Sequence, residues 1–261
     1  MKKLAILLAA TALLTACAKS PTGRNQLIIV DANAMTKMGA QSFEDMKGKE
    51  KVSTDKKLNQ YVQCVAKPIL QVLPAKWQDN WEIVVFDSEQ VNAFALPGRK
   101  IGVYTGILNV TENSDQLAAI IGHEVGHVIA NHGAERVSQS TAANALMAGA
   151  AVASKDSPYQ GAIMAGLGLG AQYGALLPYS RLHESEADVL GLKYLIEAGY
   201  QADQSMALWQ NMAKLSDGKR PMELLSTHPA PQTRINNLAK HIKKYQSQGV
   251  VAQMPRPSCK I

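Results

Sequence analysis

Two histidines and a glutamate have the spacing of a metal site in the segment His123-Glu124-Val125-Gly126-His127. Because residues four apart lie on one face of an α-helix, His123 and His127 can bind a single metal ion with their ring nitrogens. Glu124 is displaced by roughly 100° and can reach a water molecule at the metal instead of the metal itself. The pattern is typical of zinc-dependent hydrolysis, with Glu124 as the general base.

An ordinary half-buried helix that happens to carry two histidines is the alternative reading of this segment. A chance pattern of this kind is expected in roughly one such chain in 200. Its apolar neighbours are Leu117, Ala118, Ile120, Ile121, Val128 and Ile129. A glutamate and two histidines inside so apolar a helix would be costly unless they served a site, so we favour the metal site.

An acidic segment downstream offers the third protein ligand that a catalytic zinc ion needs beside an open position. It reads His183-Glu184-Ser185-Glu186-Ala187-Asp188, on a helix predicted to begin near Ser180. Glu184 and Asp188 share a helix face, whereas Glu186 points about 200° away from Glu184. We therefore expect Glu184 to bind the metal and Asp188 to accept the N–H of a histidine ligand. Taken alone, the segment would read as a solvated acidic turn.

Helices and a few short strands must position these side chains. Of the 261 residues, 46% are hydrophobic and only 5% aromatic, which favours close helix packing over a β-sandwich. Apolar periodicity predicts helices at 32–46, 55–73, 115–127 and beyond, 180–198, 203–216 and 232–245, and strands at 81–86, 91–96 and 100–104. The predicted fold class is α+β and mostly α.

Residues 142–177 form a stretch rich in Ala, Gly and Met that is interrupted at Ser154–Pro158. Its uncharged part, Gly161–Leu177, is shorter than the roughly 20 residues that span a bilayer. Three glycines four residues apart allow helices to approach closely. We expect a buried helix hairpin here, not a membrane span.

The first residues are expected to be an export signal. Two lysines precede an apolar run that is too short to span a bilayer, and Leu14-Thr15-Ala16-Cys17 follows. This ending resembles a bacterial lipobox, in which Cys17 is lipid-modified and becomes the new N-terminus; an ordinary signal peptide with a chance cysteine is the alternative. Since residue 18 is Ala and not Asp, the sorting rule of such lipoproteins implies the periplasmic face of the outer membrane.

Export would also decide the state of the other cysteines. Cys64 and Cys259 are the two that remain, and in an oxidising periplasm we expect them to pair, although two free thiols are the alternative. The formal charge is +6, or +4 without residues 1–16. Its lysine cluster at Lys240, Lys243 and Lys244 has no interleaved aromatic residues, so we expect no nucleic-acid partner.

Three segments together resemble the zinc metallopeptidases of family M48, namely His123–His127, Glu184–Asp188 and Asn92–Gly98. More narrowly, residues from about 23 to 243 resemble its bacterial periplasmic lipoprotein members. The resemblance implies a zincin-like domain with a small β-sheet at the active-site edge, and it agrees on Glu184 as third ligand. We expect a signal peptide at 1–16, an anchor and tether at 17–25, a peptidase domain at 26–250 and a tail at 251–261.

In that family, the strand that corresponds to Asn92–Gly98 borders the active site. Asn92, Phe94 and Ala95 are therefore expected to border the substrate. Arg99 stands where a second glycine is usual, a departure expected to alter substrate preference at the rim.

The family also carries a His-Pro motif followed by an arginine, which falls here on His228-Pro229 and Arg234. The resemblance implies that His228 either hydrogen-bonds the developing oxyanion or occupies the open position of zinc at rest. Arg234 would contact substrate or the oxyanion. A surface histidine in a helix-entry loop is the alternative for His228.

Three other histidines are expected to stay out of the site. His132 would lie about 140° round one continuous helix from His127. His183 is expected in the second shell or at the surface, and His241, among lysines, at the surface.

The expected function is that of a metalloendopeptidase with one Zn²⁺ per chain, acting on unfolded or misassembled polypeptides of the cell envelope. An extended peptide would add to the edge strand that contains Phe94. A gated, chaperone-like factor for outer-membrane proteins is the alternative; it would work with the assembly machinery, and residues 142–177 would cover the site. A purely structural zinc is disfavoured, because such sites usually fill four positions with Cys or His.

Overall fold

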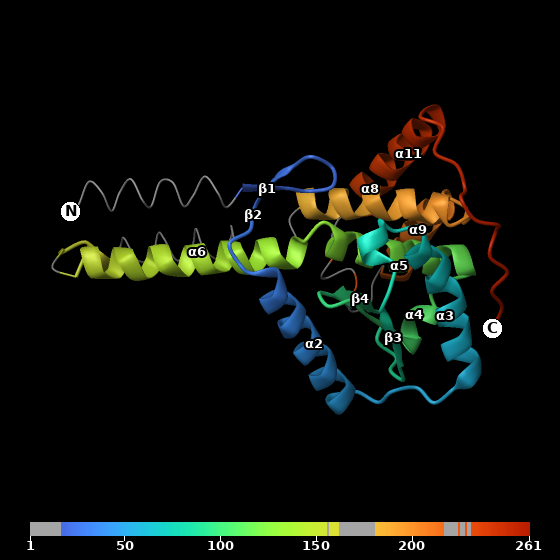
Figure 1. The fold of residues 1–261 in the computed structure, drawn as a ribbon, viewed down its shortest axis with the longest axis horizontal. Helices are drawn as coiled ribbons and strands as arrows, with labels where there is room; N and C mark the ends of the chain where they lie inside the picture. The colour runs from blue at the N-terminus through green and yellow to red at the C-terminus, as the bar shows by residue number, and fades with distance from the viewer. Residues whose placement is uncertain (1–16, 156, 162–180, 217–223, 225–227, 229–230) are drawn as a thin grey trace. The chain divides into compact units, whose positions relative to one another are not determined.

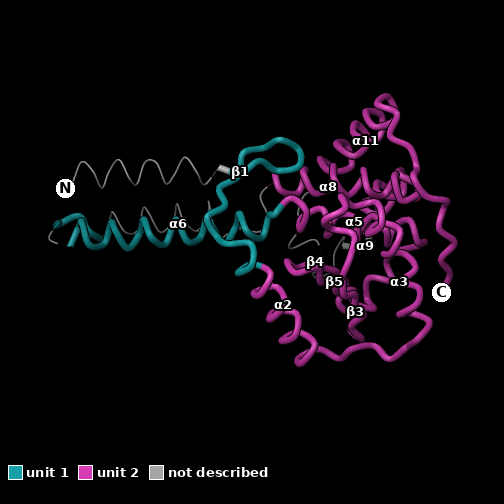
Figure 2. Tube along the Cα trace, in the orientation of Figure 1, with its two compact units in different colours: residues 1–35, 131–178 teal, residues 36–130, 179–261 magenta. Residues whose placement is uncertain are grey.

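The computed structural model describes residues 17–155, 157–161, 181–216, 224, 228 and 231–261. The chain divides into two compact units (Figure 2). Unit 1 comprises residues 1–35 and 131–178, and unit 2 comprises residues 36–130 and 179–261. The peptidase domain expected at 26–250 is therefore shared between two units, and the expected tail at 251–261 is part of unit 2.

Unit 1 combines a two-stranded antiparallel sheet with one long helix. Strands β1 (Cys17–Lys19) and β2 (Asn25–Leu27) pair with each other, and α6 runs from His132 to Ala153. Glu135 of α6 is buried and accepts a bidentate hydrogen-bonded ion pair from Arg24 at 2.8 and 2.6 Å, which ties the loop before β2 to the helix.

The three-stranded sheet of unit 2 has the order β3-β5-β4. Its strands are β3 (Glu82–Phe86), β4 (Ala93–Leu96) and β5 (Lys100–Tyr104). β3 runs parallel to β5, and β4 runs antiparallel to it, so β4 forms one edge of this sheet. Side chains alternate between its two faces, and this alternation gives each face a different partner.

On one face of the sheet, an aromatic cluster consists of Phe43, Phe86, Phe94 and Tyr104, with ring centroids 5.3 to 6.3 Å apart. Phe43 lies on α2 (Ala32–Lys49). Ala93 and Ala95 alternate with Phe94 along β4 and belong to the main core instead. Thus Phe94 anchors the sheet to α2, and the small residues of β4 leave room for the helix on the other face.

The turn between β4 and β5 contains Arg99, at the position where a second glycine is usual in the family. Gly98 and Arg99 both have left-handed backbones, with φ of +84° and +61°, a conformation that glycine adopts without strain. The side chain of Arg99 donates to the carbonyl of Lys76 at 2.5 Å, and its backbone carbonyl accepts from Glu82 N. The described bonds of Arg99 thus reach Lys76 of η1 and Glu82 of β3. The effect on substrate preference at the rim stays a prediction.

Five helices complete the described part of unit 2, besides α2 and the short η1 (Ala75–Trp77) and α4 (Thr105–Leu108). They are α3 (Lys56–Gln71), α5 (Ser114–Ile129), α8 (Arg181–Glu197), α9 (Gln204–Ser216) and α11 (Pro231–Ser247). α5 lies between the sheet and α8, and it also packs against α3 and α9 (Figure 1). Such a central helix must be apolar on all sides, and residues 115–118 and 120–129 of α5 are all buried.

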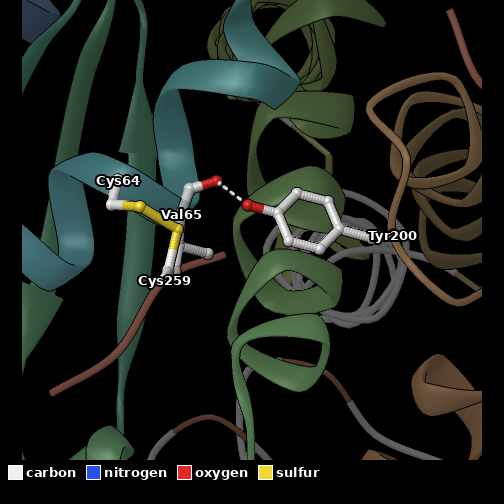
Figure 3. Close-up of a disulfide and its surroundings, with 4 residues drawn as sticks. All are labelled: Cys64, Val65, Tyr200 and Cys259. Carbon is white, nitrogen blue, oxygen red and sulfur yellow. Dashed lines mark hydrogen bonds between the residues drawn. A yellow bond between two sulfur atoms is a disulfide. The ribbon is translucent and has the colours of Figure 1, made fainter. Parts of the chain in front are cut away.

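The C-terminal segment of unit 2 is fastened to three of these helices. Gln253 N donates to the carbonyl of Glu197 at the end of α8, and Arg256 pairs with Asp115 in the first turn of α5 at 3.1 Å. Cys259 forms a disulfide with Cys64 of α3, as expected from the sequence (Figure 3). In the same view, the Tyr200 hydroxyl donates to the Val65 carbonyl at 2.9 Å.

α5 and α8 approach each other through residues without bulky side chains. A Cβ atom on Gly191 of α8 would lie 2.8 Å from backbone atoms of Gly122 and His123, and one on Gly126 would lie 2.9 Å from the Ala187 carbonyl. Real Cβ atoms essentially never approach so closely. The backbones of the two helices therefore touch along this line, which fixes α8 beside the histidines of α5.

The α+β, mostly helical fold class is confirmed, and β5 has the predicted bounds. The predicted helices after residue 114 also occur, with one correction. The helix that carries His127 ends at Ile129, Asn131 has a left-handed φ of +56°, and α6 begins at His132. Residues 115–153 therefore do not form one continuous helix.

The interruption expected near Ser154 is confirmed by the end of α6 at Ala153, whereas residues 162–177 of the predicted hairpin lie outside the described part. Among the described helices, none combines the length and apolar character that a bilayer span requires.

Gly191→Ala should destabilise unit 2. Alanine in place of glycine normally stabilises a helix by about 1 kcal/mol, but here the new methyl group meets the α5 backbone. We expect the free energy of unfolding in urea to fall by about 1–3 kcal/mol, as for other overpacked cores. Gly149→Ala in α6 is the matched control, because its Cβ would meet nothing within 4 Å. Equal stability of the two variants would contradict the close contact.

Candidate metal centre

α5 brings its two histidines together at the line where α8 lies closest. The helix starts at an N-cap, where Asn113 Oδ1 accepts from Gln116 N at 3.0 Å. His123 and His127 are 5% and 2% exposed, and their Nε2 atoms lie 3.1 Å apart. Two buried imidazole nitrogens that converge in this way are arranged to bind one cation.

α8 adds Glu184, which is 3% exposed. Its carboxylate oxygens lie 3.5 Å from His123 Nε2 and 3.5 Å from His127 Nε2. The helical phase that placed Glu184 and Asp188 on one face in the sequence therefore brings Glu184 to the α5 pair.

His228 supplies a fourth donor. Its Nδ1 lies 2.9 and 3.0 Å from the two Glu184 oxygens and 3.3 Å from His123 Nε2. The histidine is 4% exposed, so it is not the surface residue of a helix-entry loop. Pro229 of the same motif lies outside the described residues.

The donor set fits a zinc ion. One nitrogen or oxygen atom from each of His123, His127, Glu184 and His228 lies within 4.8 Å of all the others. In a tetrahedral site with bonds of 2.0–2.1 Å, ligand atoms are separated by about 3.3 Å, and the close pairs here are separated by 2.9 to 3.5 Å. Imidazole nitrogens with a carboxylate oxygen are also the ligands that zinc prefers.

Glu124 lies beside the donor set and is not one of its members. Glu124 is 4% exposed, and its Oε1 has no hydrogen-bond partner among the described residues. His228 Nε2 lies 3.5 Å from this oxygen. Burial raises the pKa of Glu124 above its ordinary value. A buried carboxylate oxygen without a hydrogen bond normally lowers the stability of a protein by about 1–3 kcal/mol. This cost favours a functional role for Glu124, such as proton transfer.

Asp188 and Arg234 form a second layer behind the donors. Asp188 Oδ1 lies 2.9 Å from His123 Nδ1, the position expected for an acceptor of its N–H. Arg234 donates to both Asp188 oxygens, from Nε at 2.9 Å and from Nη2 at 2.5 Å. Its Nη1 lies 2.9 Å from Glu184 Oε2, so Arg234 contacts the site's own carboxylates here and not an open substrate position.

Charges within this network support one another. Burial raises the pKa of Glu184, but hydrogen bonds with His123 and His228 outweigh it and hold that pKa well below its usual range. Burial likewise raises the pKa of Asp188, and Arg234 and His123 lower it by more. The pKa of His123 is about 9, because hydrogen bonds to Asp188 and Glu184 outweigh burial and the Arg234 cation. Glu184 is thus held ionised, the charge state in which it can bind a cation.

The remaining histidines require corrections. His132 opens α6, so its phase on a continuous helix does not apply. His183 is 4% exposed and is therefore not at the surface. His241 is half-buried, and burial lowers its pKa, so its lysine neighbours did not imply a surface position. As expected, none of the three belongs to the group of four metal donors.

The side chains of the expected substrate strand mostly pack inside the protein. Phe94 faces the aromatic cluster, while Ala95 faces the core, and the carbonyl of Asn92 accepts from Tyr104 N at 3.1 Å. A peptide on this edge would therefore use the β4 backbone. Leu224 N donates to the carbonyl of Val91, directly before that edge, at 3.3 Å.

Trp209 of α9 is a neighbour of the site that the sequence analysis missed. Its ring centroid lies 3.7 Å from Arg234 Cζ and 6.3 Å from the His123 ring centroid. No local motif marks it, because a tryptophan on the apolar face of a helix is normally a core residue.

Comparison with known proteins agrees with this geometry. The family model described as "Peptidase family M48" matches residues 56–242 of the 261, a range that includes every donor named above. The chain is 32% identical over 189 residues to the mitochondrial metalloendopeptidase OMA1 of Schizosaccharomyces pombe, covering 71% of this chain and 53% of that protein.

Two further relatives have the same pattern of partial coverage. One is the OMA1 protein of Saccharomyces cerevisiae, 32% identical over 172 residues, covering 63% of this chain and 48% of the relative. The other is the beta-barrel assembly-enhancing protease of Yersinia pestis, 26% identical over 211 residues, covering 77% and 42%. The chain thus spans about half the length of the curated relatives it matches.

Asp188→Asn should weaken zinc binding without emptying the site of ligands. The amide keeps the shape of Asp188 but loses the charge that orients His123, and such outer partners typically contribute about 10–100-fold to metal affinity. We expect a loss of that size in competition titrations with a chromophoric chelator. Asp115→Asn changes a buried carboxylate in the first turn of α5, the helix that carries His123, and should leave zinc affinity unchanged. Equal affinities for the wild type and Asp188→Asn would refute the role of Asp188.

Proposed function

We propose that this chain, which belongs to peptidase family M48, is a zinc-dependent endopeptidase. Its proposed substrates are unfolded or misassembled proteins of the bacterial cell envelope. One observation carries the activity: four buried donors converge within 4.8 Å beside a buried carboxylate that is not among them. Three donors and a separate general base are the requirements of metal-assisted peptide hydrolysis.

Within this proposal, His123, His127 and Glu184 hold the zinc, and His228 occupies a position that substrate or water must take for turnover. Zinc, when bound, supplies a Lewis acid that polarises the water and the scissile carbonyl. Glu124 accepts the proton of the attacking water and delivers it to the leaving amine nitrogen. The raised pKa of Glu124 favours this role, because a buried carboxyl group can retain the proton between the two transfers.

The proposed substrate is an extended, unfolded polypeptide. Among the described strands, β4 pairs only with β5 and lies at an edge of the sheet. A peptide that adds to this edge is recognised mainly through backbone hydrogen bonds, which select for an extended conformation more than for sequence. The half-buried Phe94 and the small Ala95 point away from the edge and would not restrict the sequence of the peptide.

The proposed location is the periplasmic face of the outer membrane, with a lipid anchor at Cys17. The support lies in the sequence, where Leu14-Thr15-Ala16-Cys17 follows a short apolar run. The Cys64–Cys259 disulfide adds support, since structural disulfides persist in oxidising compartments.

A second candidate function is assembly of outer-membrane proteins with little intrinsic proteolysis. It is favoured by the fourth donor, His228, and by the likeness to the relative from Yersinia pestis that is named a beta-barrel assembly-enhancing protease. In this candidate function, a partner of the assembly machinery would displace the His228 segment from the site. The covering role expected for residues 142–177 stays a prediction, since residues 162–177 lie outside the described part.

Glu124→Gln separates these functions. The substitution keeps the size of the side chain but removes its proton acceptor, so we expect cleavage of β-casein to fall by roughly 10²–10⁴-fold. Zinc should remain at one ion per chain, measured by elemental analysis. Glu112→Gln, the same chemical change before the start of α5, should cleave like the wild type. Unchanged turnover in Glu124→Gln would eliminate the hydrolytic mechanism, and no turnover in the wild type would favour the assembly factor.

Cys17→Ser tests the anchor. Because the serine variant cannot carry a thioether-linked lipid, we expect it to move from the membrane fraction to the soluble periplasmic fraction. Ala18→Asp should remain lipid-modified but move to the inner membrane, as the sorting rule implies. Recovery of Cys17→Ser in the outer-membrane fraction would show that another feature holds the protein there.

A further inference from the structure

Trp209 belongs to the main hydrophobic core and also lies behind the metal donors. It lies on α9, is 5% exposed, and its ring face covers the guanidinium group of Arg234 at 3.7 Å. Its ring centroid lies 6.3 Å from that of His123, with the two rings at an interplanar angle of 78°. Trp209 therefore lies against the cation that orders the second layer and beside a metal donor.

The cation under this ring is unusually constrained. Arg234 is 4% exposed, and its nitrogens reach both oxygens of Asp188 and one oxygen of Glu184. The N–H groups of a guanidinium donate near its plane, so its faces need other partners. Nη2 also lies 3.1 Å from His123 Nδ1. An aromatic face is well suited to a desolvated arginine, because the negative face of its quadrupole attracts the cation.

Asp188 transmits the position of Arg234 to the metal donors. Its Oδ1 receives the Arg234 Nη2 bond and lies 2.9 Å from His123 Nδ1. If the guanidinium plane tilted, Asp188 would lose its bidentate partner, and the orientation of His123 would lose its support. Partners of this kind set the tautomer and ring orientation of a histidine ligand.

We propose that Trp209 is a positioning residue of the zinc site, which acts through Arg234 and Asp188 on His123. It touches no reacting atom in this assignment. The inference depends on the proposed zinc site but not on proteolysis, since its readout is metal affinity.

A purely structural role for Trp209 is the competing explanation, and the fold offers a matched control for it. A cavity of about 20 Å³, room for a single water molecule, is lined by Trp209, Leu208 and Asp188 among others. Leu208 is 1% exposed and precedes Trp209 on α9. Leu208→Ala therefore disturbs the same part of the core and leaves the ring on Arg234 in place.

The test compares zinc affinity and thermal stability in five variants of the full chain. Trp209→Leu removes the aromatic face and should weaken zinc binding about 10-fold or more in chelator competition. Trp209→Phe retains an aromatic face and should stay within about 3-fold of the wild type. Leu208→Ala should lose thermal stability but keep wild-type zinc affinity.

Two variants, Arg234→Met alone and Arg234→Met with Trp209→Leu, show whether Trp209 acts through the arginine. In an Arg234→Met background, Trp209→Leu should weaken zinc binding no further, because the group that it positions is already absent. Two outcomes would overturn the proposal: unchanged zinc affinity in Trp209→Leu, or losses that add fully in the double variant. A failure of casein cleavage in all variants would count against the proposed function and leave this test unaffected.

Discussion

The contact between the backbones of α5 and α8 is the constraint on which the site depends. At Gly122, Gly126 and Gly191 no side chain separates the helices, and a methyl group on Gly191 would meet the backbone at 2.8 Å. Because the helices lie this close, the carboxylate of Glu184 reaches within 3.5 Å of both histidines of α5. The glycines that look like weak points in two buried helices are thus the reason that three donors converge.

That proximity places many ionisable groups in a volume from which water is excluded, and the second layer offsets the cost. Buried charges are tolerated when each is paired and hydrogen-bonded. Asp188 meets both Arg234 and His123, and Glu184 meets Arg234 and His228. Glu124 is the exception, with Oε1 left without a hydrogen bond among the described residues. The network therefore pairs the buried carboxylates of Glu184 and Asp188, and it leaves Glu124, the proposed proton acceptor, without such a partner.

Local patterns in the sequence predicted much of this arrangement. Helical periodicity predicted α3, capping residues predicted the start of α5 and the end of α8, and alternation predicted β3. The four-residue spacing paired the histidines and placed Glu184 with Asp188 on one face. The interruption at Asn131 was missed because the residues on both sides favour a helix, although asparagine is one of the few residues that readily adopts a left-handed backbone. The position of Trp209, the half-buried position of His241 and the bond from Leu224 to Val91 depend on contacts between distant segments, for which a single sequence carries no local signal.

His228 differs from the other three donors in how it is held, and this difference bears on access to the site. His123, His127 and Glu184 belong to the two helices whose backbones touch, so the close packing of α5 on α8 holds the backbone of all three. His228 lies in neither helix; its backbone N–H donates to the carbonyl of Leu224, whose own N–H reaches Val91 beside the β4 edge. A catalytic zinc must keep one position open for water or substrate. If the chain cleaves peptides as proposed, His228 is the donor that can yield at the lowest structural cost, and a peptide arriving along β4 would meet Leu224 first.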